Sequence, residues 1–260
     1  DHRDLHLSIR RQRQMCIRDR YRSGNPVLTS NAFNTTAISS ETMTINGTVN
    51  KTFLSLTLLM VTGYYTFMSG QIMSGFAIFS LIAAFIVAII TMYKKEWSPI
   101  TVPIYAILEG IGLGWISYSF NSLYDGIVLS AICITVSILL AMLMIYRSGL
   151  IKPTENFKLG VAAATGGIFV LYMINLVMSV FGSQMGIMNI QNASLMSIGF
   201  SLFVIVIAAL NLVVDFDFIE EGAEKGAPKY MEWFGALGLM VTLVWLYLEI
   251  LRLLAKLRSR

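Results

Sequence analysis

The stretch LGVAAATGGIFVLYMINLVMSVFGSQMGIMNIQNASLMSIGFSLFVIVIAALNLVV, residues 159–214, contains no Asp, Glu, Lys or Arg in 56 consecutive positions. About 20 apolar residues in a helix cross a bilayer core of about 30 Å, so this stretch is long enough for two crossings. The polar segment at 181–194 then forms the turn between them. Charge returns at once in DFDFIEEGAE, residues 215–224. An ionisable group at membrane depth is costly, which makes these carboxylates functional candidates.

The composition of the whole chain indicates the same class of protein. Charged residues make up 13% of the chain, against about 25% in ordinary soluble domains. Hydrophobic residues reach 56%, and the mean hydropathy is +0.69. We therefore predict an all-α polytopic membrane bundle. The pI of about 9.1 reflects basic residues near the N-terminus and beside apolar segments, so the expected partner is the lipid bilayer and not nucleic acid.

The first 50 residues differ from the rest of the chain. Residues 1–20 are rich in Arg and lack the apolar segment of a signal peptide, and we interpret them as a translated non-native artefact. The alternative is a genuine basic cytoplasmic tail. Residues 21–50 are rich in Ser, Thr and Asn and are predicted to form a flexible polar arm before the transmembrane domain at 51–260.

Histidine and cysteine chemistry depends on that first segment. It contains His2, His6 and Cys16, so the remaining chain has no histidine and keeps only Cys133. Disulfide frameworks, His- or Cys-based zinc sites and His-based catalytic triads are therefore not expected. No GxSxG motif is present either, and we expect neither an enzyme nor a resident cofactor.

Seven crossings follow from the spacing of charges and of Gly and Pro breakers. The predicted spans are residues 51–69, 75–93, 101–120, 126–146, 158–181, 196–215 and 232–254. Alternate loops carry all the Lys and Arg residues between spans, namely Lys94, Lys95, Arg147, Lys152, Lys158, Lys225 and Lys229. This bias predicts a cytoplasmic N-terminus. A seventh crossing places the basic C-terminal tail outside, so a re-entrant last segment is the alternative.

Small residues mark candidate helix contacts. Gly110 and Gly114 lie four apart in EGIGLG, and Gly160 lies four before Ala164. This spacing lets two membrane helices approach closely, so we predict a packing role for Gly110, Gly114 and Gly160.

The carboxylates after the long apolar run divide between two helical faces. Asn211 and Asp215 are four apart and share one face, whereas Asp217 points nearly the opposite way. We expect Asp215 to face the interior of the bundle. The alternative, especially for residues 217–224, is a solvated helix end whose acids pair with Lys225 and Lys229.

Two more carboxylates fall within predicted spans. Glu109 lies midway along the third span and needs a partner such as Arg147, Lys152 or a backbone donor, or else a proton. Glu249 lies near the end of the last span, where it can extend to the interface or pair with Arg252.

These features together resemble the Bax inhibitor-1 family, in its bacterial YccA-like branch, over about residues 22–260. The resemblance is carried by the seven-span pattern, by EGIGLG, by the Asp-bearing end of the sixth span and by the closing LVWLYLEILRLL. It implies a bacterial inner-membrane bundle whose last helix is surrounded by the others. It also implies a pH-sensitive calcium leak governed by two aspartates, one from each of the last two spans.

The resemblance places the first of these aspartates on Asp215, but Thr242 stands where the second is expected. Two carboxylates in contact are needed to share a proton. The resemblance alone therefore does not decide whether this chain is gated by pH. Such gating needs Asp217, Glu109 or Glu249 as the second acid.

Two functions are compatible with the sequence. One is a leak for Ca²⁺ or H⁺ in which Asp215 is the ion- or proton-responsive group, with Asn175 and Asn211 as further oxygen ligands. The other is a regulator that binds a membrane-bound protease or another membrane protein, with the polar arm as the contacting segment.

Overall fold

Seven long helices form the part of the chain that the structure describes. The structure is a computed structural model, and it describes residues 42–70, 74–151 and 153–259. The elements are α2 (Ile45–Ser69), α3 (Ser74–Tyr93), the short 3-10 helix η3 (Lys95–Trp97), α4 (Ser98–Leu123), α5 (Ile127–Arg147), α6 (Glu155–Val180), α7 (Leu195–Glu224) and α8 (Met231–Arg258). Within these ranges the only β pairing is an isolated bridge between Thr42 and Pro228. The predicted all-α membrane bundle is confirmed.

The segment before the first span differs from the expectation at its boundary. The hydroxyl of Thr44 accepts a hydrogen bond from the Gly47 N–H at 3.0 Å, and this cap starts α2 at Ile45 rather than at residue 51. Residues 45–50 are therefore helical and not part of a polar arm. The expected artefact at 1–20 and the rest of the arm at 21–41 lie outside the described residues.

Length and composition fit a membrane protein. The helices α3, α4, α5, α6, α7 and α8 are each long and apolar enough to cross a bilayer. The remaining helix, α2, has 25 residues, which at 1.5 Å per residue gives a length of about 37 Å. It packs along α4 and contacts α8.

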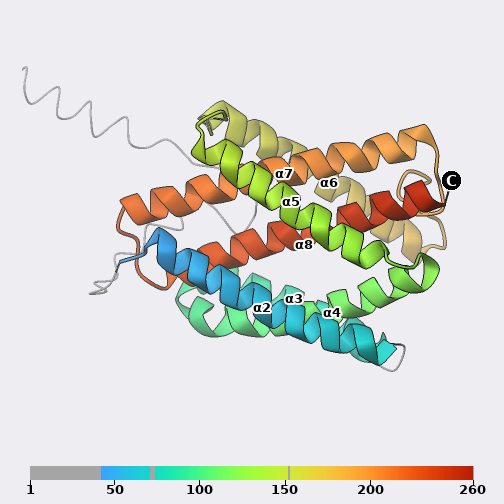
Figure 1. The fold of residues 1–260 in the computed structure, drawn as a ribbon, viewed down its shortest axis with the longest axis horizontal. Coiled ribbons are helices and arrows are strands. Elements are labelled where there is room, and N and C mark those ends of the chain that lie inside the picture. Colours follow the sequence, from blue (N-terminus) through green and yellow to red (C-terminus); the bar gives the residue numbers. More distant parts are fainter. Residues whose placement is uncertain (1–41, 71–73, 152, 260) are drawn as a thin grey trace, which may run out of the picture.

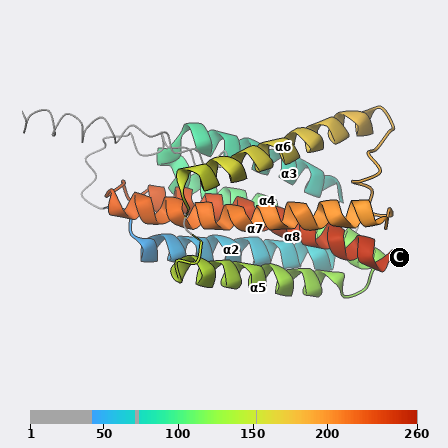
Figure 2. The same ribbon diagram turned by 90° about the horizontal axis from the view of Figure 1, so that it is seen from above.

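The last helix runs through the middle of the bundle (Figures 1 and 2). It contacts α2, α4, α5 and α7. In the apolar 18-residue stretch of α8, 78% of the residues are buried inside the bundle. In the corresponding stretch of α6, which lies at the periphery, the share is 11%. α8 is one unbroken helix of 28 residues, long enough to cross a bilayer, so it does not turn back within the bundle as the re-entrant alternative requires.

Glycines allow α2 and α4 to approach closely. A Cβ atom built on Gly110 would stand 2.0 Å from the Thr62 hydroxyl oxygen, and one on Gly114 would stand 2.3 Å from the Gly63 carbonyl oxygen. Gly160 differs from the expectation, because a Cβ there would meet nothing within 4 Å. This residue is not at a close helix contact.

The two ends of the bundle hold different loops. We call the end that holds the starts of α2 and α8 the basic end, because the loops with Lys and Arg lie there. Four contacts join different elements at this end: Thr44 with Glu232, Ser98 with Tyr230, Tyr146 with Glu220 and Lys158 with Asp217. We call the opposite end, with the C-terminus of α8 and the 181–194 loop, the tail end.

Candidate functional site

A buried hydrogen bond joins Asp215 of α7 to Thr242 of α8. The Thr242 hydroxyl donates to Asp215 Oδ2 at 2.6 Å. Asp215 is completely buried and Thr242 is 3% exposed, so the contact lies inside the bundle. The residue that stands at the position of the expected second aspartate thus contacts Asp215 directly. A hydroxyl brings its own proton to such a contact, whereas a second carboxylate would have to share one.

Asn211 extends this polar cluster by one helical turn. Its amide nitrogen donates to the Thr165 hydroxyl of α6 at 2.8 Å and to the Ile207 carbonyl at 2.9 Å. Its Oδ1 atom is buried and has no hydrogen-bond partner among the described residues. Asn211 and Asp215 share a face, with Cβ atoms about 5–6 Å apart at this spacing. We call the buried residues Asn211, Asp215 and Thr242, together with the half-buried Thr165, the buried polar cluster.

Asp217 lies on the other side of α7. Its carboxylate is 2.5 Å from the ammonium of Lys158 on α6, which is also 3.5 Å from Glu155. Asp217 therefore does not serve as the second acid beside Asp215. The acids of this helix end are therefore paired, as in the alternative given above. Asp217 pairs with Lys158, which that alternative did not include, and Glu221 forms an ion pair with Lys225.

Glu109 is buried in α4, and its expected partners are not found. Among the described residues no hydrogen bond or salt bridge reaches its carboxyl group, from Arg147 or from any backbone donor. The other expected partner, Lys152, lies outside the described residues.

The depth of Glu109 follows from the packing of α4 against α8. Two contacts show that these helices run parallel: Ser98 Oγ donates to the Tyr230 carbonyl at 2.8 Å, and Ser117 Oγ lies 2.6 Å from the Tyr247 hydroxyl. Glu109 is 11 residues after the first contact on α4, and Thr242 is 12 residues after it on α8. The two residues therefore lie at nearly the same level, within about 2 Å along the axis.

Glu249 is buried nearer the tail end and has its own partners. The Tyr172 hydroxyl donates to Glu249 Oε1, and Arg252 donates to the same oxygen at 2.6 Å. The Arg252 guanidinium also lies 5.2 Å from the centre of the Tyr172 ring. The expected pairing with Arg252 is present. Glu249 is seven residues from Thr242, about 10 Å along α8, so it does not contact Asp215.

Asn175 does not join the buried polar cluster either. Its Oδ1 atom accepts a hydrogen bond from the Met185 N–H at 3.0 Å, which fixes the 181–194 loop at the tail end. Within the described ranges, no group of three His, Cys, Asp or Glu side chains is placed to hold a metal ion.

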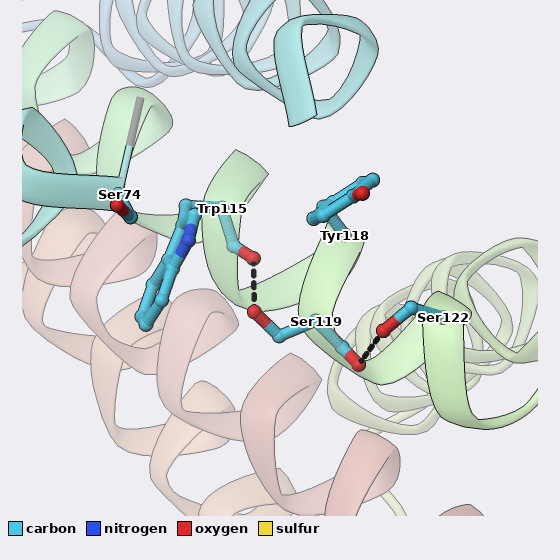
Figure 3. Close-up of a pocket in the computed structure, with 5 residues that line it drawn as sticks. All are labelled: Ser74, Trp115, Tyr118, Ser119 and Ser122. Carbon is cyan, nitrogen blue, oxygen red and sulfur yellow. Dashed lines mark hydrogen bonds between the residues drawn. The ribbon is translucent and has the colours of Figure 1, made fainter. Parts of the chain in front are cut away.

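A surface pocket of about 280 Å³ lies away from the buried polar cluster, between the start of α3 and the C-terminal half of α4 (Figure 3). It is lined by Ser74, Trp115, Tyr118, Ser119 and Ser122. The hydroxyl groups of Ser119 and Ser122 donate to carbonyl oxygens of their own helix, as the dashed lines show. The pocket holds no ionisable carboxylate and is not part of the candidate site.

Sequence reasoning missed three residues that shape the site. Thr165 lies in a charge-free run without any distinguishing pattern, and Lys158 was counted only as a loop charge. Glu232, the first residue of the last predicted span, is buried, accepts hydrogen bonds from Thr44 at the start of α2, and pairs with Lys51. A glutamate one residue into a helix is a common feature, so no sequence signal distinguishes this one.

The fold and the buried polar cluster define a polytopic membrane protein with a carboxylate enclosed between its last two helices. A family model described as Bax inhibitor 1 like matches residues 25–259. The chain belongs to this family. Comparison with curated proteins and with solved structures gives no match.

Proposed function

We propose that the protein is a proton-sensitive cation leak, closed in this conformation by the hydrogen bond between Thr242 and Asp215. The observation that carries the proposal is the complete burial of Asp215 against a donor on the central helix. Asp215 belongs to α7, and its carboxylate is hydrogen-bonded to α8. The contact between these two helices therefore depends on whether this carboxyl group is protonated.

The direction of the response follows from hydrogen-bond strength. An ionised carboxylate accepts a hydrogen bond roughly twice as strongly as a neutral group, a difference of about 1–1.5 kcal/mol. Proton uptake by Asp215 therefore weakens the link between α7 and α8, and the leak rises as the pH falls. A difference of 1.4 kcal/mol corresponds to about a tenfold change in the open population.

Oxygen atoms are available to a cation at this level. Asn211 Oδ1 is buried without a partner among the described residues, one turn from Asp215. Amide, hydroxyl and carboxylate oxygens are the ligands that hard cations such as Ca²⁺ prefer. Ca²⁺ and H⁺ are the ions that we propose the protein conducts or senses.

We place the basic end on the cytoplasmic side of a bacterial inner membrane. Lys94 and Lys95 follow α3, and their ammonium groups lie 5.8 Å and 5.6 Å from the rings of Trp97 and Phe234. Basic and aromatic side chains gather at membrane interfaces, and basic ones favour the cytoplasmic side. The buried polar cluster then lies nearer to the cytoplasmic end of α7 and α8 than to their other end.

The regulator alternative depends on the polar arm. Met43 is 2% exposed, and its N–H donates to the Ala227 carbonyl at 2.7 Å, so this part of the chain is bound to its own bundle. It is not available to a partner in this conformation. The earlier part of the arm lies outside the described residues, and binding to a membrane protease stays a prediction.

The experiment is Ca²⁺ flux into liposomes that contain an indicator dye and the purified full-length protein. Asp215→Asn should abolish the pH response and fix the leak near the value that the wild type reaches at low pH. The matched control is Asp217→Asn, two residues away on the opposite face and paired with Lys158. This control should keep the pH response, and equal behaviour of the two variants would overturn the proposal.

A further inference from the structure

A fully buried lysine lies at the tail end of the central helix. Lys256 is 1% exposed, and its ammonium donates to the Ile187 carbonyl at 2.8 Å, the Ser201 hydroxyl at 2.9 Å and the Ser197 carbonyl at 3.2 Å. An ammonium has three N–H donors, and these three oxygens match them. No carboxylate lies within 4 Å of it among the described residues.

The surrounding oxygens form a built site. Ser197 is completely buried and Ser201 is 1% exposed. The Ser197 hydroxyl donates to the same Ile187 carbonyl at 2.9 Å, which fixes the 181–194 loop above α7. Two carbonyl groups and a hydroxyl are ligands typical of a dehydrated cation. The charge is therefore held by neutral oxygens, although an isolated buried charge is costly.

Lys256 lies on one polar stripe of α8 with two residues already described. Thr242, Glu249 and Lys256 are spaced by seven residues, two helical turns, so they lie on one face in steps of about 10 Å. Each is 3% exposed or less, and their hydrogen-bond partners include side chains of α6 and α7. The stripe leads from Asp215 in the interior to the tail end.

We propose that the ammonium of Lys256 is a tethered cation that fills a cation-binding site at the end of this stripe and limits the leak there. The inference rests on the proposed function, because it assigns the second barrier of the same pathway. A permeating cation would meet the three oxygens of Ile187, Ser197 and Ser201, which the lysine occupies. Positive charge at this point also repels a cation that approaches from the tail end.

Substitutions at position 256 separate charge from packing. Lys256→Met keeps an apolar stem and removes the ammonium, and it should raise the Ca²⁺ leak by about tenfold. Lys256→Arg keeps the charge and should stay within about twofold of the wild type. The matched control is Arg258→Ala, because Arg258 is exposed and donates at the same end to the Asp125 carbonyl at 2.5 Å. This control should leave the leak unchanged.

Chemical rescue tests the site itself. Lys256→Ala removes three carbons and the ammonium, so n-propylammonium matches the missing atoms. Adding it should return the leak of this variant toward the wild-type value, whereas n-propanol should not. Equal effects of the two compounds would overturn the inference.

The remaining outcomes distinguish this inference from the proposed function. If Lys256→Met leaves the leak unchanged while Asp215→Asn abolishes the pH response of the leak, the role of Lys256 as a tethered cation is wrong and the proposed leak function stands. If neither variant changes the leak, the proposed function fails and the inference falls with it. If Lys256→Met also releases the large dye calcein, the bundle has lost its structure and the cation site is not the cause, which overturns the inference.

Discussion

Replacing Thr242 by valine removes the hydrogen bond to Asp215 with almost no change in side-chain volume. The hydroxyl lies 2.6 Å from Asp215 Oδ2, and both residues are buried. A hydrogen bond to a charged group contributes about 1.5–3 kcal/mol, so we expect Thr242→Val to lower the free energy of unfolding by about 2 kcal/mol. The same change should raise the Ca²⁺ leak at neutral pH, because the link between α7 and α8 is lost.

The assay is equilibrium unfolding in detergent micelles, with Thr135→Val as the matched control. Thr135 is also buried, but its hydroxyl donates at 2.8 Å to the Ala131 carbonyl of its own helix. Such bonds within a helix add little stability, so this control should change the unfolding free energy by less than about 0.5 kcal/mol. Equal losses in the two variants would refute the reasoning, as would the same loss from Thr242→Val in an Asp215→Asn background.

Three further substitutions test the packing that positions the site. Gly114→Ala places a Cβ 2.3 Å from the backbone oxygen of Gly63 and should lower the free energy of unfolding by about 1–3 kcal/mol. Gly160→Ala meets nothing within 4 Å and should be neutral or stabilising by up to about 1 kcal/mol; thermal unfolding that ranks the two variants equally would contradict the close packing of α2 and α4. Glu232→Gln removes the charge that pairs with Lys51 and should accelerate hydrogen exchange at the start of α2, because the carboxylate also accepts bonds from the Thr44 N–H and hydroxyl at 2.9 Å. Unchanged exchange there would show that this ion pair does not hold the helix start.

The helices and the division of the acids could be predicted from the sequence. The charge-free runs determine where helices cross, because a charged group in the bilayer core is costly. The four-residue spacing of Asn211 and Asp215 places them on one face, and Asp217 contacts a different helix as its position requires.

The partners across helices could not be predicted in the same way. A membrane helix is apolar toward lipid and toward its neighbours, so its hydrophobic pattern does not reveal which face is buried. The contacts of Lys158 with Asp217 and of Thr165 with Asn211 depend on that rotation. Lys256 was assigned to a basic tail outside the membrane, but its aliphatic stem and ammonium are buried between α8, α7 and the 181–194 loop.

The most direct test of the account measures Ca²⁺ leak and the protonation of Asp215 in the same proteoliposomes over a range of pH. Infrared spectra of protein labelled with ¹³C-aspartate, after subtraction of the Asp215→Asn spectrum, isolate the band of this carboxyl group. The account predicts that the leak rises over the pH interval in which the carboxyl group becomes protonated. A leak that changes with pH while the Asp215 band stays constant would contradict it.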